Sequence, residues 1–205
     1  MSAPSAIRPV VDLSDLPSVA FGSRDVLWWG VIGFMIVEGM TLACAAAAWF
    51  FLQRDAAAWP PPGTPLPGLV IPTINLAILL ASLVPYGILD RAAKRLDAPA
   101  TTRWLWISTA FGAATVVLRW FELRAVHVSW DGSGYGSAVW AVLVGHYTLL
   151  IVDLLETGTS AVIFAAGDYE PKHFPDASDN VFYTRFMVLV WVPLYAMVYL
   201  LPRWI

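Results

Sequence analysis

Long apolar runs alternate with short polar segments along almost the whole chain. Five of these runs have about twenty residues or more, which is the length that an α-helix needs to cross a lipid bilayer. They cover residues 26–52, 71–89, 103–123, 136–166 and 181–201. Polar and apolar residues do not alternate within the runs, so the pattern does not favour a β-barrel. We therefore predict an all-α membrane protein, with an N-terminal tail over residues 1–25 and a five-transmembrane-helix bundle over residues 26–205.

The composition agrees with a membrane protein. Of the 205 residues, 59% are hydrophobic and only 13% are charged, whereas a soluble domain usually has about 25% charged residues. No basic stripe is present, which argues against a nucleic-acid partner. Cys44 is the single cysteine, so the chain has neither an internal disulfide nor a multi-cysteine metal site. We expect Cys44 to be a small buried residue.

The distribution of positive charge predicts the orientation. Lysine and arginine concentrate before the first run, between the second and third runs, and near the fourth connection; these residues are Arg8, Arg24, Arg91, Lys94, Arg95, Arg103, Lys172 and Arg185. The opposite segments carry fewer positive charges. By the positive-inside rule, the N-terminus is cytoplasmic and the C-terminus lies on the opposite side, which is periplasmic if the source is bacterial. We expect a multi-pass protein of a bacterial inner (plasma) membrane.

Glu38 lies near the middle of the first run, without a lysine or arginine within helical reach. Acids within lipid are retained mainly where they pair, line a water path or meet a partner. Two interpretations stay open at this stage. Glu38 belongs to a proton-linked or lipid-headgroup site, or it is a neutral acid that hydrogen-bonds a neighbouring helix.

Four further ionisable residues and one histidine lie in the third and fourth runs. Arg119 and Glu122 are three residues apart and predict an interfacial ion pair in which Arg119 extends towards the membrane surface. His146 and Asp153 are seven residues apart and share one helix face, with Glu156 near it. His146 has no second histidine within a run, so we expect it to contact Glu122 and not a metal or haem. Asp153 and Glu156 are candidates for a cytoplasmic-side proton or partner surface, and a purely structural polar seam is equally open.

Four stretches, in order, resemble subunit III of the haem–copper oxidases, the cytochrome c oxidase family. They are WWGVIGFMIVEGM (28–40), WPPPGTPLPGLVIPTINLAILLAS (59–82), RWFELRAVHVSWDGSGYGSAVWAVLVGHYTLLIVD (119–153) and VWVPLYAMVYLLPRW (190–204). Glu38 falls on the family's intramembrane glutamate. Glu122 and His146 occupy matching positions around the YGS segment at 135–137. The resemblance covers roughly residues 26–205.

The resemblance implies a subunit with the last five helices of a seven-helix form. Such a subunit is non-catalytic and packs directly against subunit I of an enzyme that reduces oxygen to water and pumps protons in the aerobic electron transport chain. Haem and copper are then in partner subunits, and this chain holds no cofactor except bound phospholipid. Subunit II, a small helical subunit and membrane lipids are the other partners. The implied roles are lipid binding, oxygen and proton supply, and stability during turnover.

The chain departs from the family pattern in two places. Leu149 stands where the family often has a second histidine, and Arg185 and Val188 stand where longer forms carry histidine and aspartate. These departures weaken the expectation of proton collection at that end of the chain.

Other functions use the same features. An accessory protein of nitric oxide reductase and a quinol oxidase subunit III share the five-helix scaffold. A proton-coupled transporter using Glu38, Asp153 and Glu156 is a reading from a different class. Its water-lined path usually involves broken helices, and the apolar runs here are unbroken. No nucleotide-binding loop, nucleophile elbow or zinc motif is present, so we expect no active site in this chain.

Overall fold

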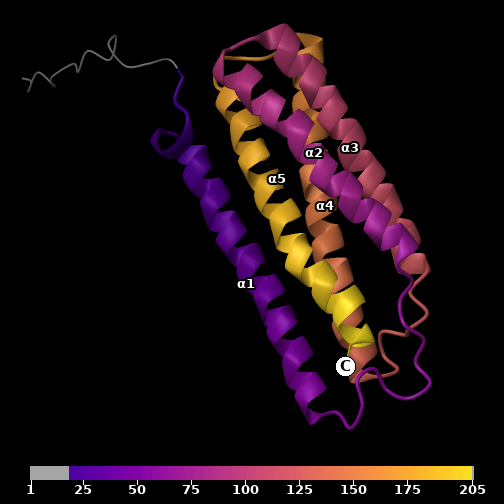
Figure 1. Cartoon of the computed structure of the whole chain (residues 1–205). Helices are drawn as coiled ribbons and strands as arrows, with labels where there is room; N and C mark the ends of the chain where they lie inside the picture. The colour runs from indigo at the N-terminus through magenta and orange to yellow at the C-terminus, as the bar shows by residue number, and fades with distance from the viewer. Residues whose placement is uncertain (1–18, 205) are drawn as a thin grey trace, which may run out of the picture.

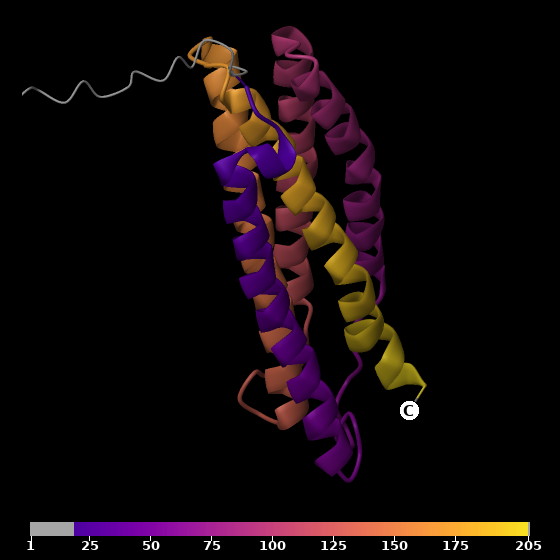
Figure 2. The same cartoon turned by 90° about the vertical axis from the view of Figure 1, so that its left-hand side faces the viewer.

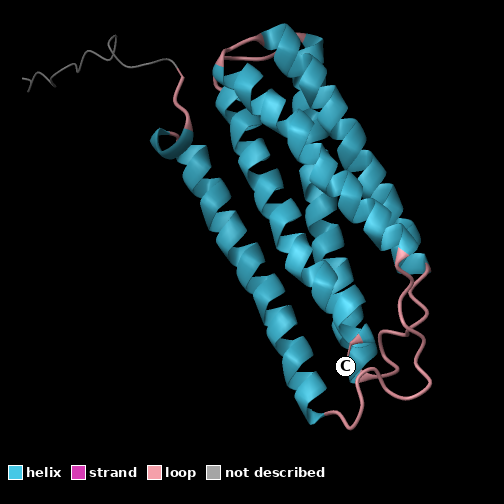
Figure 3. Cartoon of the chain, viewed as in Figure 1, coloured by secondary structure: helices cyan, strands magenta, loops and turns pink. Residues whose placement is uncertain are grey.

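The computed structural model of the chain describes residues 19–204. Five long helices make up most of it, and their bounds are α1 (Val26–Asp55), α2 (Val70–Lys94), α3 (Ala98–Arg124), α4 (Gly134–Ala166) and α5 (His173–Tyr195). Over residues 19–204 the chain consists of helices and loops without strands (Figure 3). Five helices, the last one counted through Arg203, are long and apolar enough to cross a membrane. The predicted five-helix architecture is confirmed.

The predicted tail over residues 1–25 lies mostly outside the described residues. Its last part is described, and Gly22–Arg24 form a short 3₁₀ helix there. Asp25 then caps α1, because its side chain accepts a hydrogen bond from the backbone N–H of Leu27 at 3.1 Å.

Helix α5 begins earlier than hydropathy predicts. The prediction placed its start at residue 181, whereas the helix starts at His173. The added segment is polar, yet Phe174, Ser178 and Asn180 are buried in the bundle. A hydropathy pattern misses this segment because it is polar, whereas in the bundle Ser178 donates to Asp90 and Asn180 accepts from Thr157.

Helices α2 to α5 pack together, and α1 lies along one side of them against α4 and α5 (Figures 1 and 2). In the most apolar stretch of α1 only 11% of residues are buried, compared with 50% in that of the last span. Most of α1 therefore faces outwards. The expectation that Cys44 is buried is wrong, because it lies on the exposed side of α1.

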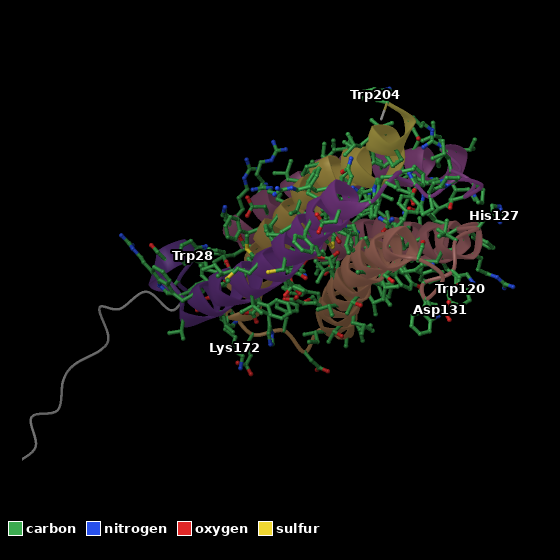
Figure 4. The ribbon with its side chains drawn as sticks, turned by 90° about the horizontal axis from the view of Figure 1, so that it is seen from below. Trp28, Trp120, His127, Asp131, Lys172 and Trp204 are labelled. Atoms are coloured by element: carbon green, nitrogen blue, oxygen red, sulfur yellow. The ribbon has the colours of Figure 1, made fainter. Side chains whose placement is uncertain are left out.

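Tryptophans lie at both ends of the bundle. Figure 4 shows Trp28 and Lys172 towards one end, and Trp120 and Trp204 towards the other. Tryptophans at both ends are typical of the two membrane interfaces.

The end of α5 changes helix type after a proline. Pro193 cannot donate the backbone hydrogen bond of a regular helix, and a five-residue π-helix, Ala196–Leu200, follows. The wider turn brings Tyr199 to face α3, where its hydroxyl donates to Glu122. Arg203 then binds the backbone carbonyls of Tyr199 and Pro67, which ties the C-terminal end to the loop before α2.

Candidate functional site

The first candidate site is centred on a fully buried arginine. Arg119 on α3 is 0% exposed, and its Nη1 donates to Oε1 of Glu122 at 2.6 Å. Its Nη2 lies 3.3 Å from Nδ1 of His146 on α4. The guanidinium carbon is 3.8 Å from the ring centroid of Trp191 on α5. The prediction that Arg119 extends to the membrane surface is therefore wrong, because partners inside the bundle bind its charge.

Glu122 connects three helices. Besides Arg119, its carboxylate accepts from the hydroxyl of Tyr199 and from Nδ2 of Asn75 on α2, the latter at 3.4 Å. A buried carboxylate needs several donors to replace water. The expected contact between Glu122 and His146 exists only through Arg119, whose guanidinium lies between them.

The hydrogen bonds assign the tautomer of His146. A guanidinium can only donate, so Nδ1 accepts from Arg119. A carbonyl can only accept, so Nε2–H donates to the backbone oxygen of Met187, 3.2 Å away. The imidazole is therefore neutral in this arrangement, and its ring stacks on Trp191 with centroids 4.4 Å apart. Both ring nitrogens are thus engaged by groups within the bundle.

The second candidate site is centred on Asp153. The Tyr86 hydroxyl donates to its Oδ2 at 3.1 Å, and the Thr184 hydroxyl donates to its Oδ1 at 2.5 Å. Thr157 extends the network, with its hydroxyl 3.3 Å from that of Tyr86 and donating to Oδ1 of Asn180 at 3.0 Å. His146 and Asp153 thus share a buried helix face, as predicted, but they belong to separate networks.

A small cavity adjoins the second network. It has about 10 Å³ of internal space and is bounded by Ser82, Thr115, Asp153 and Thr184. Such a space is close to the minimum that one water molecule requires, and its hydroxyl and carboxylate groups suit one. The arrangement allows Asp153 to exchange a hydrogen bond with a single water.

Glu38 is buried on α1 against α5. The Tyr183 hydroxyl lies beside its carboxyl. Within residues 19–204, Oε2 of Glu38 and the hydroxyl of Tyr183 have no partner at hydrogen-bonding geometry. Both interpretations of Glu38 remain open, because the acid is buried but is not part of either network.

Glu156 lies apart from the other predicted residues. It is exposed on α4 and borders a pocket with Asp176 and Asp179. Glu156 follows Asp153 by three residues on α4, as the sequence indicates. Its side chain is nevertheless exposed, whereas that of Asp153 is buried in the bundle.

Several residues of the two networks were not found from the sequence. They are Asn75, Tyr86, Thr157, Asn180, Thr184 and Tyr199. Spacing offers a signal for some of them, because Thr157 follows Asp153 by four residues and Thr184 follows Asn180 by four, each on one helix face. No such signal exists for Tyr199, because a π-helix shifts the register before it.

The fold and the networks define a class: an integral membrane protein with five helices, four of them joined by buried polar contacts and one mostly exposed. A profile of the family described as Cytochrome c oxidase subunit III matches residues 18–203 of the chain. The chain therefore belongs to the cytochrome c oxidase subunit III family, as its sequence motifs predicted. It is a haem–copper oxidase subunit III.

Individual relatives agree with the family. Cytochrome c oxidase subunit 3 of Thermostichus vulcanus is 29% identical over 182 residues, which cover 85% of this chain and 87% of the relative. The protein of that name from Synechocystis sp. is 27% identical over 188 residues, covering 88% of this chain and 78% of the relative. The Petromyzon marinus protein of that name is 25% identical over 181 residues, covering 84% and 69%.

Proposed function

We propose that this chain is a non-catalytic subunit of a bacterial cytochrome c oxidase and packs directly against subunit I. One observation carries the proposal. Arg119 on α3 binds both Glu122 and His146 of α4, and Glu122 extends the contact to α2 and the end of α5. The side chains best suited to bind a cofactor are thus committed to joining helices. A rigid scaffold for neighbouring subunits is what this arrangement supports.

The orientation follows from charge. Arg91, Lys94 and Lys172 lie at the same end of the bundle, and the positive-inside rule places that end in the cytoplasm. The C-terminus is then periplasmic, in the bacterial inner membrane. Haem and copper belong to partner subunits in this proposal, and subunit II and a small helical subunit complete the complex.

An apolar groove between α1 and α5 supports lipid binding. It has a volume of about 320 Å³ and is lined by small and apolar residues that include Gly39, Ala43, Ala46 and Leu194. Glu38 directly precedes Gly39. We infer that the groove holds an acyl chain of a bound phospholipid, through which the subunit stabilises the complex during turnover and supports oxygen and proton supply.

Purification in mild detergent tests the main proposal. A tagged version of this chain is isolated with its partners, and absorbance spectra are recorded before and after the partners are stripped off. We expect haem absorbance only while subunit I is present. A haem spectrum from the isolated chain would overturn the assignment as non-catalytic.

The variant Glu38→Gln tests the lipid and stability role. It removes the ionisable group while keeping the shape, so we expect initial turnover close to wild type, together with less bound phospholipid and faster inactivation. Glu170→Gln is the matched control, since Glu170 is exposed in a loop. Immediate loss of activity in a fully assembled Glu38→Gln complex would contradict the role.

A further inference from the structure

A pocket lies where α1 and α5 begin and α2 ends, and it has a volume of about 300 Å³. Phe21, Trp28 and Phe182 form an aromatic wall, in which the rings of Trp28 and Phe182 stack with centroids 6.2 Å apart. Lys94 from α2 and Arg185 from α5 line the pocket as well. We call it the basic pocket. In the orientation proposed above, it lies at the cytoplasmic surface of the membrane.

The charges at the open side of the basic pocket are positive. The side chains of Lys94 and Arg185 are 52% and 44% exposed. That of Asp90 is only 12% exposed, and Asp179 is buried. The carboxylate of Asp90 already accepts hydrogen bonds from Lys94 at 2.9 Å and from Ser178 at 2.6 Å. An anion that enters the pocket therefore meets the two cations before it meets either acid.

The guanidinium of Arg185 has donors that no carboxylate of the described chain uses. Within residues 19–204 its only carboxylate contact is with Asp90, where Nη2 and Oδ2 are 3.8 Å apart. That separation is longer than a hydrogen bond. A guanidinium has five N–H donors in one plane and binds a phosphate through two of them at once. The pocket thus offers a phosphate a planar set of donors and a second cation, Lys94.

An apolar path leads from the basic pocket towards the middle of the bundle, where α1 lies along α5 (Figures 1 and 2). Arg185, Leu189 and Pro193 are successively four residues apart on α5, so they share one helix face, and all three are exposed. Pro193 lines the apolar groove between α1 and α5. The helix rises about 12 Å from Arg185 to Pro193, and one leaflet of the hydrocarbon core is about 15 Å thick. An acyl chain with its headgroup at Arg185 therefore reaches the groove.

The charge and the apolar path together select the ligand. Basic pockets between transmembrane helices on the cytoplasmic side are typical sites for anionic lipid headgroups. Phosphatidylethanolamine would place an ammonium group beside Lys94 and Arg185, which repel it. Inorganic phosphate, or an acidic segment of a partner subunit, would leave the apolar face of α5 unused. An anionic phospholipid such as phosphatidylglycerol uses both features.

We propose that the basic pocket binds the phosphate of an anionic phospholipid whose acyl chain lies in the apolar groove between α1 and α5. Arg185 and Lys94 bind the phosphate, and Trp28 packs beside the glycerol, at the depth where tryptophan is favoured in membranes. The proposal rests on the proposed function and deepens it, because it gives the headgroup class of the lipid inferred there.

Lipid binding to the purified oxidase complex is the first test. The complex is delipidated, and native mass spectrometry follows the binding of phosphatidylglycerol, phosphatidylethanolamine and inorganic phosphate. Arg185→Gln keeps a polar side chain without the charge, and Arg95→Gln is the matched control, an exposed arginine at the end of α2 outside the pocket. Loss of one basic residue at an anionic membrane surface lowers affinity about 5-fold.

We expect that loss of phosphatidylglycerol affinity, or a larger one, for Arg185→Gln and no comparable loss for Arg95→Gln. We also expect the wild-type complex to prefer phosphatidylglycerol to phosphatidylethanolamine. Equal affinities of the two variants, or equal binding of the two lipids by the wild type, overturn the proposal. Inorganic phosphate that fills the site in preference to the lipid overturns it as well.

Photo-crosslinking identifies the occupant and covers the case in which Arg185→Gln folds poorly. A photoreactive amino acid replaces Phe182 on the pocket wall, or Val117 on the exposed side of α3 as control, in membranes that contain both lipids. We expect the Phe182 probe to label phosphatidylglycerol above its share of the membrane, and the Val117 probe to label the lipids in proportion. Proportional labelling by both probes, or labelling of a partner subunit at Phe182, contradicts the proposal. A haem-containing subunit that still co-purifies then leaves the proposed function intact, whereas failure to co-purify refutes both.

Discussion

The substitution Glu122→Gln tests whether the buried ion pair stabilises the bundle. Glutamine has nearly the same shape but no charge, so it leaves the Arg119 guanidinium buried beside a neutral amide. The pair is 2.6 Å apart, and its side chains are 0% and 2% exposed. Water therefore cannot take the place of the lost carboxylate. The hydroxyl of Tyr199 still has an amide oxygen to bind, so the main effect comes from the uncompensated charge.

The expected loss of stability is large. Breaking a buried ion pair by removing one partner destabilises a protein by about 3–5 kcal/mol, against a typical total of about 5–15 kcal/mol. Glu170→Gln is the matched comparison, because Glu170 and Lys172 are 2.8 Å apart but have side chains 63% and 67% exposed. Exposed pairs contribute little, so we expect no measurable loss there. Because the chemical change is the same in both variants, the difference between their losses of stability reports the effect of burying the ion pair.

The assay is reversible unfolding in mixed micelles with increasing dodecyl sulfate, followed by tryptophan fluorescence. The double variant Arg119→Met with Glu122→Leu completes the test, since apolar residues in place of both partners remove the stranded charge. We expect the double variant to lose less stability than the sum of the losses in Arg119→Met alone and Glu122→Leu alone. Equal stability of Glu122→Gln and Glu170→Gln, or simple additivity in the double variant, would refute the reasoning.

Two further predictions concern a glycine in the first turn of α4 and the loop before α5. A Cβ at Gly136 would lie 2.1 Å from the backbone oxygen of Ser129, whereas one at Gly30 meets nothing within 4 Å. We expect Gly136→Ala to lower stability by about 1–3 kcal/mol or more in the same unfolding assay and Gly30→Ala to leave it unchanged; similar curves would contradict this. The carboxylate of Glu170 raises the pKa of Lys172 above its usual 10.5, so the bridge stabilises the loop below that pH and is lost as pH rises through the higher value. Glu170→Gln should lower the pKa of Lys172 towards 10.5, measured by NMR of methylated lysines, and an unchanged pKa would exclude the bridge as its cause.

The sequence predicted the buried site residues better than their contacts. Intramembrane position alone marked Glu38, Arg119, Glu122, His146 and Asp153 as unusual, because ionisable groups are unfavourable in lipid. All five are buried in the bundle. The sequence could not show which side chains bind them, because those partners are neutral residues such as Thr157, which has nothing unusual in its local context.

Arg119 shows why local spacing misled one prediction. A separation of three residues predicts a pair on one helix, and that pair is present. The same spacing says nothing about what lies opposite, so extension to the membrane surface was as compatible with it as burial. The opposite side holds His146 and Trp191 from two other helices, and their positions decide that the arginine is buried.

By itself, the sequence determined that the chain forms five helices suited to a membrane. The length and continuous apolarity of each segment are local properties, and a helix that crosses a bilayer requires both. Its motifs also determined the family. Only the tertiary structure decided how the polar residues pair, since the bond from Tyr199 to Glu122 joins residues 77 apart in the chain. It also decided that α5 starts at His173 and that, among residues 19–204, Oδ2 of Asp179 has no hydrogen-bond partner. These features depend on how helices pack against one another, and a hydrophobic pattern contains no term for that packing.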